Sequence, residues 1–179
     1  RYTIHIAPGI LDHSGTLLRM EKVRLSSVLA LVTNPLVGGL YGGRVTQSLE
    51  RMGYQTLQCQ IPDGEQYKTL QTVASLYDQF AAGGMDRCSH VLALGGGVTG
   101  DIAGMAAGTY LRGVGLIQIP TTLLAMVDSS VGGKTGVDLP QGKNLAGVFK
   151  QPLTVLIDPL TLQTLAEVEL RCGMAELIK

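Results

Sequence analysis

The segment Val91-Leu92-Ala93-Leu94-Gly95-Gly96-Gly97-Val98-Thr99-Gly100 decides the fold of this 179-residue chain. Its four apolar residues predict a strand that is buried on both faces, and its three consecutive glycines predict a turn into a helix. On either side of this segment, short β-branched runs alternate with longer runs of helical period. That alternation is typical of βαβ units built around a mainly parallel sheet.

We predict an α/β fold with a mainly parallel, Rossmann-like sheet flanked by helices. The predicted strands are 2–6, 27–33, 54–61, 90–94, 115–119 and 154–157. The predicted helices are 35–52, 67–82, 99–111 and 121–127, and the segment that ends at Lys179 also has helical period. No internal repeat, low-complexity tract or linker is visible, so we expect no domain boundary before about residue 160.

Composition excludes several classes of protein. The chain has 14 Lys or Arg and 14 Asp or Glu residues, and this zero formal charge argues against a dedicated nucleic-acid binder. Three distant cysteines without C-x-x-C spacing form neither a disulfide framework nor a thiolate zinc site, which fits a reducing cytoplasm. No run of 18 apolar residues and no signal peptide is present, so we expect no membrane partner.

The glycines are concentrated where we expect the chemistry, because 13 of the 24 lie between Gly95 and Gly147. Gly95 to Gly100 satisfies G-x-G-x-x-G, which lets backbone N–H groups at a helix N-terminus approach a pyrophosphate. The motif follows roughly the fourth strand, however, and the acidic residue that usually ends the next strand is missing. A ligand-free turn is the alternative, but the entropic cost of three glycines favours anion binding. Asp101 could complement the helix dipole or face a sugar hydroxyl.

Two further loops carry charge. Gly132-Gly133-Lys134-Thr135 is no P-loop, because the first glycine of that motif is replaced by Asp128. Asp128 and Lys134 could form a solvated ion pair on a surface turn, but the surrounding sequence is apolar and rich in glycine, where half-buried charges without a ligand are costly. Lys143-Asn144 adds a second cation with an amide beside it. Pro62 to Lys68 is explained by a turn that leads into a helix.

The last helix has two distinct faces. At 100° per residue, one face is apolar and the other carries polar groups, which an isolated helix would turn to water. The apolar face consists of Leu170, Met174, Leu177 and Ile178, and the other of Glu169, Cys172, Glu176 and Lys179. The histidines of the chain are His5, His13 and His90, all distant in sequence, so Glu176 lacks nearby partners for a metal site.

Five motifs in register resemble the 3-dehydroquinate synthase family, and they span the whole chain. They are Pro62-Asp63-Gly64-Glu65-Gln66-Tyr67-Lys68, the segment Gly95 to Asp101, the segment Pro120 to Thr135, Gly142-Lys143-Asn144 and Gly173-Met174-Ala175-Glu176-Leu177-Ile178-Lys179. The family is about twice as long as this chain. The resemblance therefore implies that residues 1–160 form an NAD-binding α/β domain, and that 161–179 begin an all-α C-terminal domain of which the rest is absent.

The resemblance also implies an activity, which belongs to the shikimate pathway of aromatic amino acid and chorismate biosynthesis. The family converts 3-deoxy-D-arabino-heptulosonate 7-phosphate to 3-dehydroquinate. NAD transiently oxidises a ring alcohol, phosphate leaves by β-elimination, the hydride returns, and the ring opens and closes by an aldol step. The chain is thereby identified as part of a cytoplasmic, dimeric carbon–oxygen lyase that uses NAD and zinc or Co²⁺. Its partner is a small phosphorylated sugar acid, and no nucleic acid.

Carried over residue by residue, the family's roles fall on the quoted motifs. NAD would be held by Glu65, Lys68, Gly95, Gly96, Gly97, Asp101, Thr121, Thr122, Lys134, Lys143 and Thr164. Substrate or nicotinamide would be held by Asp128, Lys134, Lys143 and Asn144, and further substrate contacts would come from Lys179 and from Arg112, which in the family crosses the dimer interface. Glu176 would be a zinc ligand, and a Glu oxygen is an acceptable ligand beside two imidazoles.

One departure and three alternatives accompany the resemblance. Where the family commonly has Leu-Pro and an Arg-Glu pair before the last helix, this chain has Leu165-Ala166-Glu167-Val168-Glu169. A sugar-phosphate cyclase that acts on sedoheptulose 7-phosphate is the nearest alternative, and the segment Asp128 to Lys134 counts against it. A non-catalytic NAD-binding module and an iron-type polyol dehydrogenase are the others, and Lys134 and Lys143 count against the dehydrogenase. Taken alone, the 179 residues are expected to be inactive.

Overall fold

A computed structural model describes residues 1–179 and contains one six-stranded sheet in which every pair of neighbouring strands is parallel. The strand order is β1-β8-β5-β4-β2-β3. The strands are β1 (Thr3–Ile6), β2 (Val28–Thr33), β3 (Gln55–Gln60), β4 (His90–Gly95), β5 (Gly115–Pro120) and β8 (Thr154–Ile157). The predicted α/β class and all six predicted strands are confirmed.

The helices also follow the sequence prediction closely. The first predicted helix is formed by α2 (Pro35–Val37), η2 (Gly38–Gly42) and α3 (Gly43–Arg51), which follow one another without a break. The second and third correspond to η3 (Glu65–Tyr67) with α4 (Leu70–Ala82), and to α5 (Gly97–Thr109) with η4 (Tyr110–Arg112). The last two are η5 (Ala125–Ser129) and α6 (Glu167–Ile178). The sequence prediction lacks η1 (Ile10–His13), α1 (Ser14–Met20) and η6 (Pro159–Thr164). Tertiary contacts hold α1, because the Gly15 N–H donates to Ser48 Oγ of α3 at 3.1 Å.

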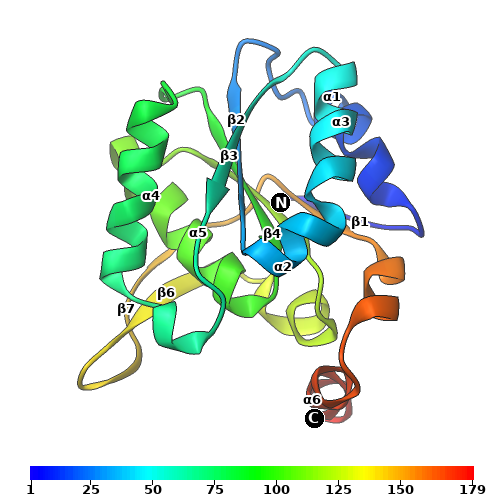
Figure 1. The fold of residues 1–179 in the computed structure, drawn as a ribbon, viewed down its shortest axis with the longest axis vertical. Coiled ribbons are helices and arrows are strands. Elements are labelled where there is room, and N and C mark those ends of the chain that lie inside the picture. The colour runs from blue at the N-terminus through cyan, green and yellow to red at the C-terminus, as the bar shows by residue number, and fades with distance from the viewer.

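Helices cover both faces of the sheet, as Figure 1 shows. On one face α4 and α5 pack against β2, β3 and β4, with Phe80 and Ile102 fully buried. On the other face α1 and α3 pack against β2, β4, β5 and β8, with Leu18 and Leu49 fully buried. Because both faces are covered, the central strands contain apolar residues at successive positions, and this is why Val91 to Leu94 predicts a strand without alternation.

A second, two-stranded sheet was not predicted. The antiparallel hairpin of β6 (Lys134–Leu139) and β7 (Gly142–Phe149) contacts α5 closely and extends to the carboxyl end of the main sheet (Figure 1). A methyl group on Gly104 would collide with Thr135, and one on Gly108 would lie 2.5 Å from Val148. These glycines of α5 therefore permit the close approach of the hairpin. The sequence gives only weak alternation here, because β7 is mostly exposed.

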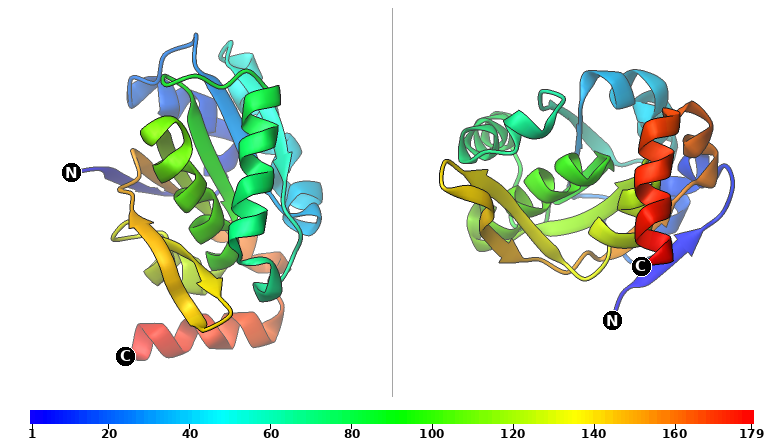
Figure 2. Two further views of the ribbon diagram at one scale, coloured as in Figure 1. Left: turned by 90° about the vertical axis from the view of Figure 1, so that its left-hand side faces the viewer. Right: turned by 90° about the horizontal axis from the view of Figure 1, so that it is seen from below.

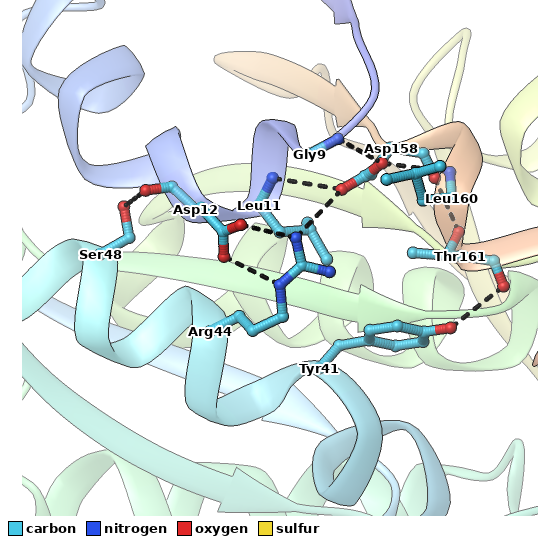
Figure 3. Close-up of polar contacts among 9 residues, drawn as sticks. All are labelled: Gly9, Leu11, Asp12, Tyr41, Arg44, Ser48, Asp158, Leu160 and Thr161. Carbon is cyan, nitrogen blue, oxygen red and sulfur yellow. Dashed lines mark hydrogen bonds and ion pairs between the residues drawn. The ribbon is translucent and has the colours of Figure 1, made fainter.

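A polar network joins the end of β8 to the opposite end of the sequence (Figure 3). The Asp158 carboxylate has no exposed surface and accepts hydrogen bonds from the N–H groups of Gly9 at 2.9 Å and Leu160 at 3.1 Å. Its other oxygen lies 3.8 Å from the Arg44 guanidinium, which binds the Asp12 carboxylate through two hydrogen bonds of 2.8 Å. Asp158 thus begins η6 and fixes it against η1 and α3.

The cysteines form no disulfide, and the helices are not of the kind that spans a membrane. All three cysteines are free, as their spacing predicts, and burial raises the pKa of the Cys59 thiol to about 12. None of the helices combines the length and the apolar character that crossing a bilayer requires.

The network predicts unequal effects of removing its two carboxylates. Replacing Asp158 by Ala leaves buried N–H groups unpaired and should lower the free energy of unfolding by about 3 kcal/mol or more. The matched change Asp12→Ala removes a half-exposed carboxylate and should cost less than about 1 kcal/mol. Urea unfolding followed by circular dichroism measures both values, and equal losses would contradict the role assigned to Asp158.

Candidate functional site

The strand order places the candidate site at the carboxyl edge of the sheet. The connection from β2 to β3 runs through α3 on one face, whereas the connection from β4 to β5 runs through α5 on the other. The loops that follow the neighbouring strands β2 and β4 therefore diverge, and open parallel sheets form a crevice at such a point. Ligands of open parallel sheets bind in such a crevice. The predicted glycine turn follows β4 and lies at this point.

The three glycines of the turn serve packing as well as access to the helix terminus. None of them has a positive φ. A methyl group on Gly95 would lie 2.6 Å from Thr99 Oγ1, one on Gly96 would lie 3.1 Å from Thr122 Cγ2, and one on Gly97 would lie 3.1 Å from Ser129 Oγ. Neighbouring side chains therefore leave no room for a side chain at Gly95 and little at Gly96 and Gly97, whereas a left-handed backbone is not the reason for glycine here.

The helix that follows the turn has an uncapped N-terminus. Gly96 stands at the N-cap of α5, and no side chain accepts a hydrogen bond from the first turn. The first N–H groups of a helix have no intrahelical partner, and the helix dipole adds partial positive charge there. Thr122 lies beside this turn, and its hydroxyl accepts a hydrogen bond from Ala125 N at 3.2 Å. The buried Thr121 donates its N–H to Gly95 O at 2.9 Å.

Next to this helix terminus lies a cleft of about 530 Å³ that brings together four of the predicted site residues, Asp101, Asp128, Lys134 and Asn144. They come from α5, η5, β6 and β7, so segments far apart in the sequence meet here. Asp128 and Lys134 form no ion pair, which excludes the pairing considered from their spacing. Exposed apolar side chains complete the wall, among them Val131, Leu145 and Phe149.

Burial and pairing set the charge of the predicted cofactor residues. The Lys68 side chain is 7% exposed, and its Nζ lies 2.6 Å from Asp101 Oδ2. Burial raises the pKa of Asp101, and the hydrogen bond and charge of Lys68 oppose that rise. Lys143 Nζ lies 2.9 Å from Glu65 Oε1 on the surface, and this pairing raises the pKa of Lys143. The motif Pro62 to Lys68 therefore contacts both α5 and β7.

Four other predicted residues lie apart from both the cleft lining and the glycine turn. Arg112 is exposed in η4, beyond the C-terminal end of α5, which is about 20 Å long and has the glycine turn at its other end. Thr164 lies in η6, where its hydroxyl is hydrogen-bonded to Tyr41 OH. Glu176 and Lys179 lie on or next to α6 and pair with each other at 3.2 Å. Nowhere in residues 1–179 do three His, Cys, Asp or Glu side chains come together so that they could hold a metal ion.

Helix α6 presents a different face than its pattern indicates. Gly173 is the buried residue of the helix, and a methyl group there would lie 2.6 Å from the backbone nitrogen of Leu124. The apolar residues Met174, Leu177 and Ile178 are exposed, and the side chain of Glu176 is 33% exposed. Figure 2 shows α6 at the end of the molecule where the strands finish and where the hairpin turns. Glu176 thus belongs to the same end of the fold as the cleft.

Sequence reasoning missed a polar pair at the crevice. Asn34 follows β2, is buried, and donates from Nδ2 to Asp63 Oδ1 at 2.7 Å. Its Oδ1 accepts from Val37 N at 2.8 Å, which makes it the N-cap of α2, with Pro35 as the next residue. The Asn-Pro pair after a strand is a recognisable helix start, so the sequence carried this signal. The partner Asp63 comes from another loop and has no local signal.

The fold and the site define an α/β domain with a ligand crevice at the carboxyl ends of a parallel sheet. The family described as 3-dehydroquinate synthase N-terminal matches residues 58–172. The chain belongs to the 3-dehydroquinate synthase family.

Curated relatives agree over the whole chain. A 3-dehydroquinate synthase from Geobacter metallireducens is 52% identical over 99% of this chain, and one from Nostoc punctiforme is 49% identical over the same share. The chain covers 49% and 48% of these two relatives, so it spans about half their length. The identity extends over the whole chain, so it supports the resemblance without depending on the site residues alone.

Solved structures confirm the fold. A 2-deoxy-scyllo-inosose synthase in complex with carbaglucose-6-phosphate, NAD⁺ and Co²⁺ has a TM-score of 0.90 at 29% identity. A 2-epi-5-epi-valiolone synthase from Streptomyces hygroscopicus with NAD⁺ and Zn²⁺ has a TM-score of 0.88 at 35% identity. Each similarity covers 99% of this chain, and 47% and 48% of the respective structures.

The contact of Gly173 with η5 predicts a specific response of α6. The change Gly173→Ala should push the helix away from Leu124 and accelerate amide hydrogen exchange throughout α6, while exchange in β4 and β5 stays unchanged. Because Gly173→Ala by itself raises helix propensity, faster exchange can only come from the collision, and Ala175→Gly, at an exposed position of the same helix, gives the effect of losing about 1 kcal/mol of local stability without one. Slower exchange in Gly173→Ala than in this control would contradict the assigned packing.

Proposed function

We propose that this chain is the NAD-binding α/β domain of a 3-dehydroquinate synthase, with residues 1–160 forming that domain and 161–179 beginning a helical one. The observation that carries the proposal is the cleft that joins Asp101, Asp128, Lys134 and Asn144 beside the uncapped N-terminus of α5. Relatives at about 50% identity support the choice of activity. The reaction would make the full protein a phosphate-eliminating carbon–oxygen lyase in the cytoplasm.

The cofactor proposed is NAD, and the geometry at the crevice fits its parts. The pyrophosphate would lie on the N–H groups that follow Gly95, Gly96 and Gly97, since anions bind where helix N–H groups are free. Asp101 would accept a ribose hydroxyl. The other residues assigned to NAD are Glu65, Lys68, Thr121, Thr122, Lys134, Lys143 and Thr164. The two related cyclase structures that hold NAD⁺ support this choice.

The substrate proposed is a small phosphorylated sugar acid. Lys134 would bind its anionic groups, and the carboxylate of Asp128 and the amide of Asn144 would orient its hydroxyl groups across the cleft. Arg112 does not line this cleft and would reach the phosphate bound by a second copy, so we propose a homodimer. Lys179 and Lys143 would add further contacts with the substrate.

The metal ion of the reaction is proposed to be zinc or Co²⁺, and this chain supplies at most one of its ligands. Glu176 is an oxygen donor at the correct end of the fold, but no three ligating side chains converge around it. A complete site would need two further ligands from outside these 179 residues. We therefore assign no catalytic step to the metal.

NAD, when bound, would accept and return a hydride, and the residues of this chain would position the two reactants. The parallel sheet fixes the glycine turn, and the hairpin fixes Lys134 and Asn144, so that cofactor and substrate meet in one cleft. Such positioning lowers the barrier because orientation entropy is lost on binding and not in the reaction step. The apolar side chains of Val131, Leu145 and Phe149 would help to exclude water.

Turnover distinguishes the proposed activity from its nearest alternative. The full-length protein should form 3-dehydroquinate from 3-deoxy-D-arabino-heptulosonate 7-phosphate in the presence of NAD and zinc. Product formation is measured by chromatography with sedoheptulose 7-phosphate as the competing substrate. Turnover of the sedoheptulose alone would identify a cyclase and refute our choice.

The isolated chain should retain cofactor binding without catalysis. Residues 1–179 should bind NAD weakly, as titration calorimetry would show, because the glycine turn and the uncapped N-terminus of α5 lie within this chain. They should form no 3-dehydroquinate, because Glu176 lacks partners for a metal site. A change of Asp101 to Asn should weaken NAD binding by roughly tenfold, the cost of one charged hydrogen bond. Dehydroquinate formation by this chain alone would contradict the proposal.

A further inference from the structure

Lys68 is a buried cation that already binds two partners within the chain. The residue is 6% exposed, and its Nζ lies 2.6 Å from both Asp101 Oδ2 and Asn144 Oδ1. An ammonium group has three N–H donors, so these two contacts leave one. Exposed lysines such as Lys143, by contrast, keep their charge at the surface. Lys68 is therefore poorly placed to act on a ligand mainly by its own contact.

A closed ring of hydrogen bonds joins Lys68 to the hairpin. Lys68 Nζ donates to Asn144 Oδ1, and Asn144 N donates to Asp138 Oδ1 at 2.7 Å. Asp138 N completes the ring by donating to the backbone oxygen of Lys68 at 2.8 Å. The ring holds Asn144 at a φ of 56°, a left-handed conformation that Asn tolerates better than most residues. It ties β6 and β7 to the segment before α4.

The ring also fixes which end of the Asn144 amide faces the cleft. Because an ammonium group only donates, the amide oxygen must face Lys68. The amide nitrogen makes no hydrogen bond within the chain, so its two donors stay free at a residue that lines the cleft. Without Lys68 the amide could turn over and present its oxygen instead.

Lys68 controls the charge of Asp101 in the same way. Burial raises the pKa of Asp101, and the acidic side chains of Glu65 and Asp128 raise it further. Lys68 is the cation that opposes these effects, while Lys134 lines the same cleft. Removing Lys68 should therefore raise the pKa of Asp101 again. The protonated form would accept a ribose hydroxyl poorly, so binding should weaken as the pH falls.

We propose that Lys68 is a positioning residue that acts on the cofactor through Asp101 and Asn144, holding the carboxylate and the amide in the orientation that the cleft requires. This inference rests on the proposed binding of NAD in that cleft. In this role Lys68 does not contact the ribose of NAD itself. It affects binding by orienting Asp101 and Asn144, which line the cleft.

The test is the pH dependence of NAD binding to the full-length protein. The change Lys68→Met should weaken NAD binding by roughly tenfold at neutral pH, and the loss should grow toward acidic pH. Adding Asp101→Asn to this variant removes the titrating group and should make the remaining affinity independent of pH. Titration calorimetry across the range in which the wild-type affinity is constant measures all three proteins.

Two further variants keep the test decisive. Lys68→Gln retains a donor for Asn144 but no charge, so it should fold even if Lys68→Met does not, and it should show the same loss at acidic pH. Lys150→Met removes another partly buried lysine, one without a carboxylate partner, and should introduce no pH dependence.

The outcomes separate this inference from the function on which it rests. A loss that is uniform with pH in both Lys68 variants would overturn the positioning role in favour of a direct contact, and an unchanged affinity would overturn it outright. Failure of the wild-type protein to bind NAD at any pH would instead refute the proposed function.

Discussion

The parallel pairing of β4 with β2 on one side and with β5 on the other is the constraint on which the rest of the structure depends. Leu31 pairs with Leu92, and Leu92 pairs with Ile117, all three fully buried. Parallel strands require crossover connections, so the chain between two such strands must return along one or the other face of the sheet. The carboxyl ends consequently meet at one edge, and the helices that leave β2 and β4 on opposite faces open the crevice there. The position of the site thus follows from strand order before any side chain is considered.

The electrostatics of the site follow from a second constraint, which is that buried charge must be paired. Lys68, Asp101 and Asp158 are all shielded from solvent, and each has partners within the chain. Zero net charge is therefore compatible with an anionic ligand, because a few cations placed at the cleft matter more than the overall balance. Lys134 differs from Lys68 in this respect, since it is exposed at the cleft and forms no ion pair.

The sequence predicted the parallel sheet and its glycine turn because both are local patterns. Apolar runs such as Val91 to Leu94 and the three glycines carry their signal within a few residues. The hairpin was missed because its stability comes from α5, through Gly104 and Gly108, and not from its own alternation. The orientation of α6 was missed for the same reason, since Gly173 is buried by η5 while the apolar residues of the helix are exposed.

Asp101, Asp128, Lys134 and Asn144 were found by resemblance, but their meeting in one cleft depends on the hairpin.

The glycines finally show how packing and binding share one requirement. A methyl group on Gly95 would collide with Thr99 of α5, and one on Gly96 or Gly97 would press against Thr122 or Ser129, so Gly96 and Gly97 allow α5 and the loop after β5 to lie close together. That approach places the uncapped N-terminus of α5 beside Thr122, where the proposed function puts the pyrophosphate. Gly104 and Gly108 repeat the principle farther along the helix and admit the hairpin that carries Lys134 and Asn144. The glycines of α5 and of its turn therefore admit both the loop after β5 and the hairpin, whose side chains line the cleft.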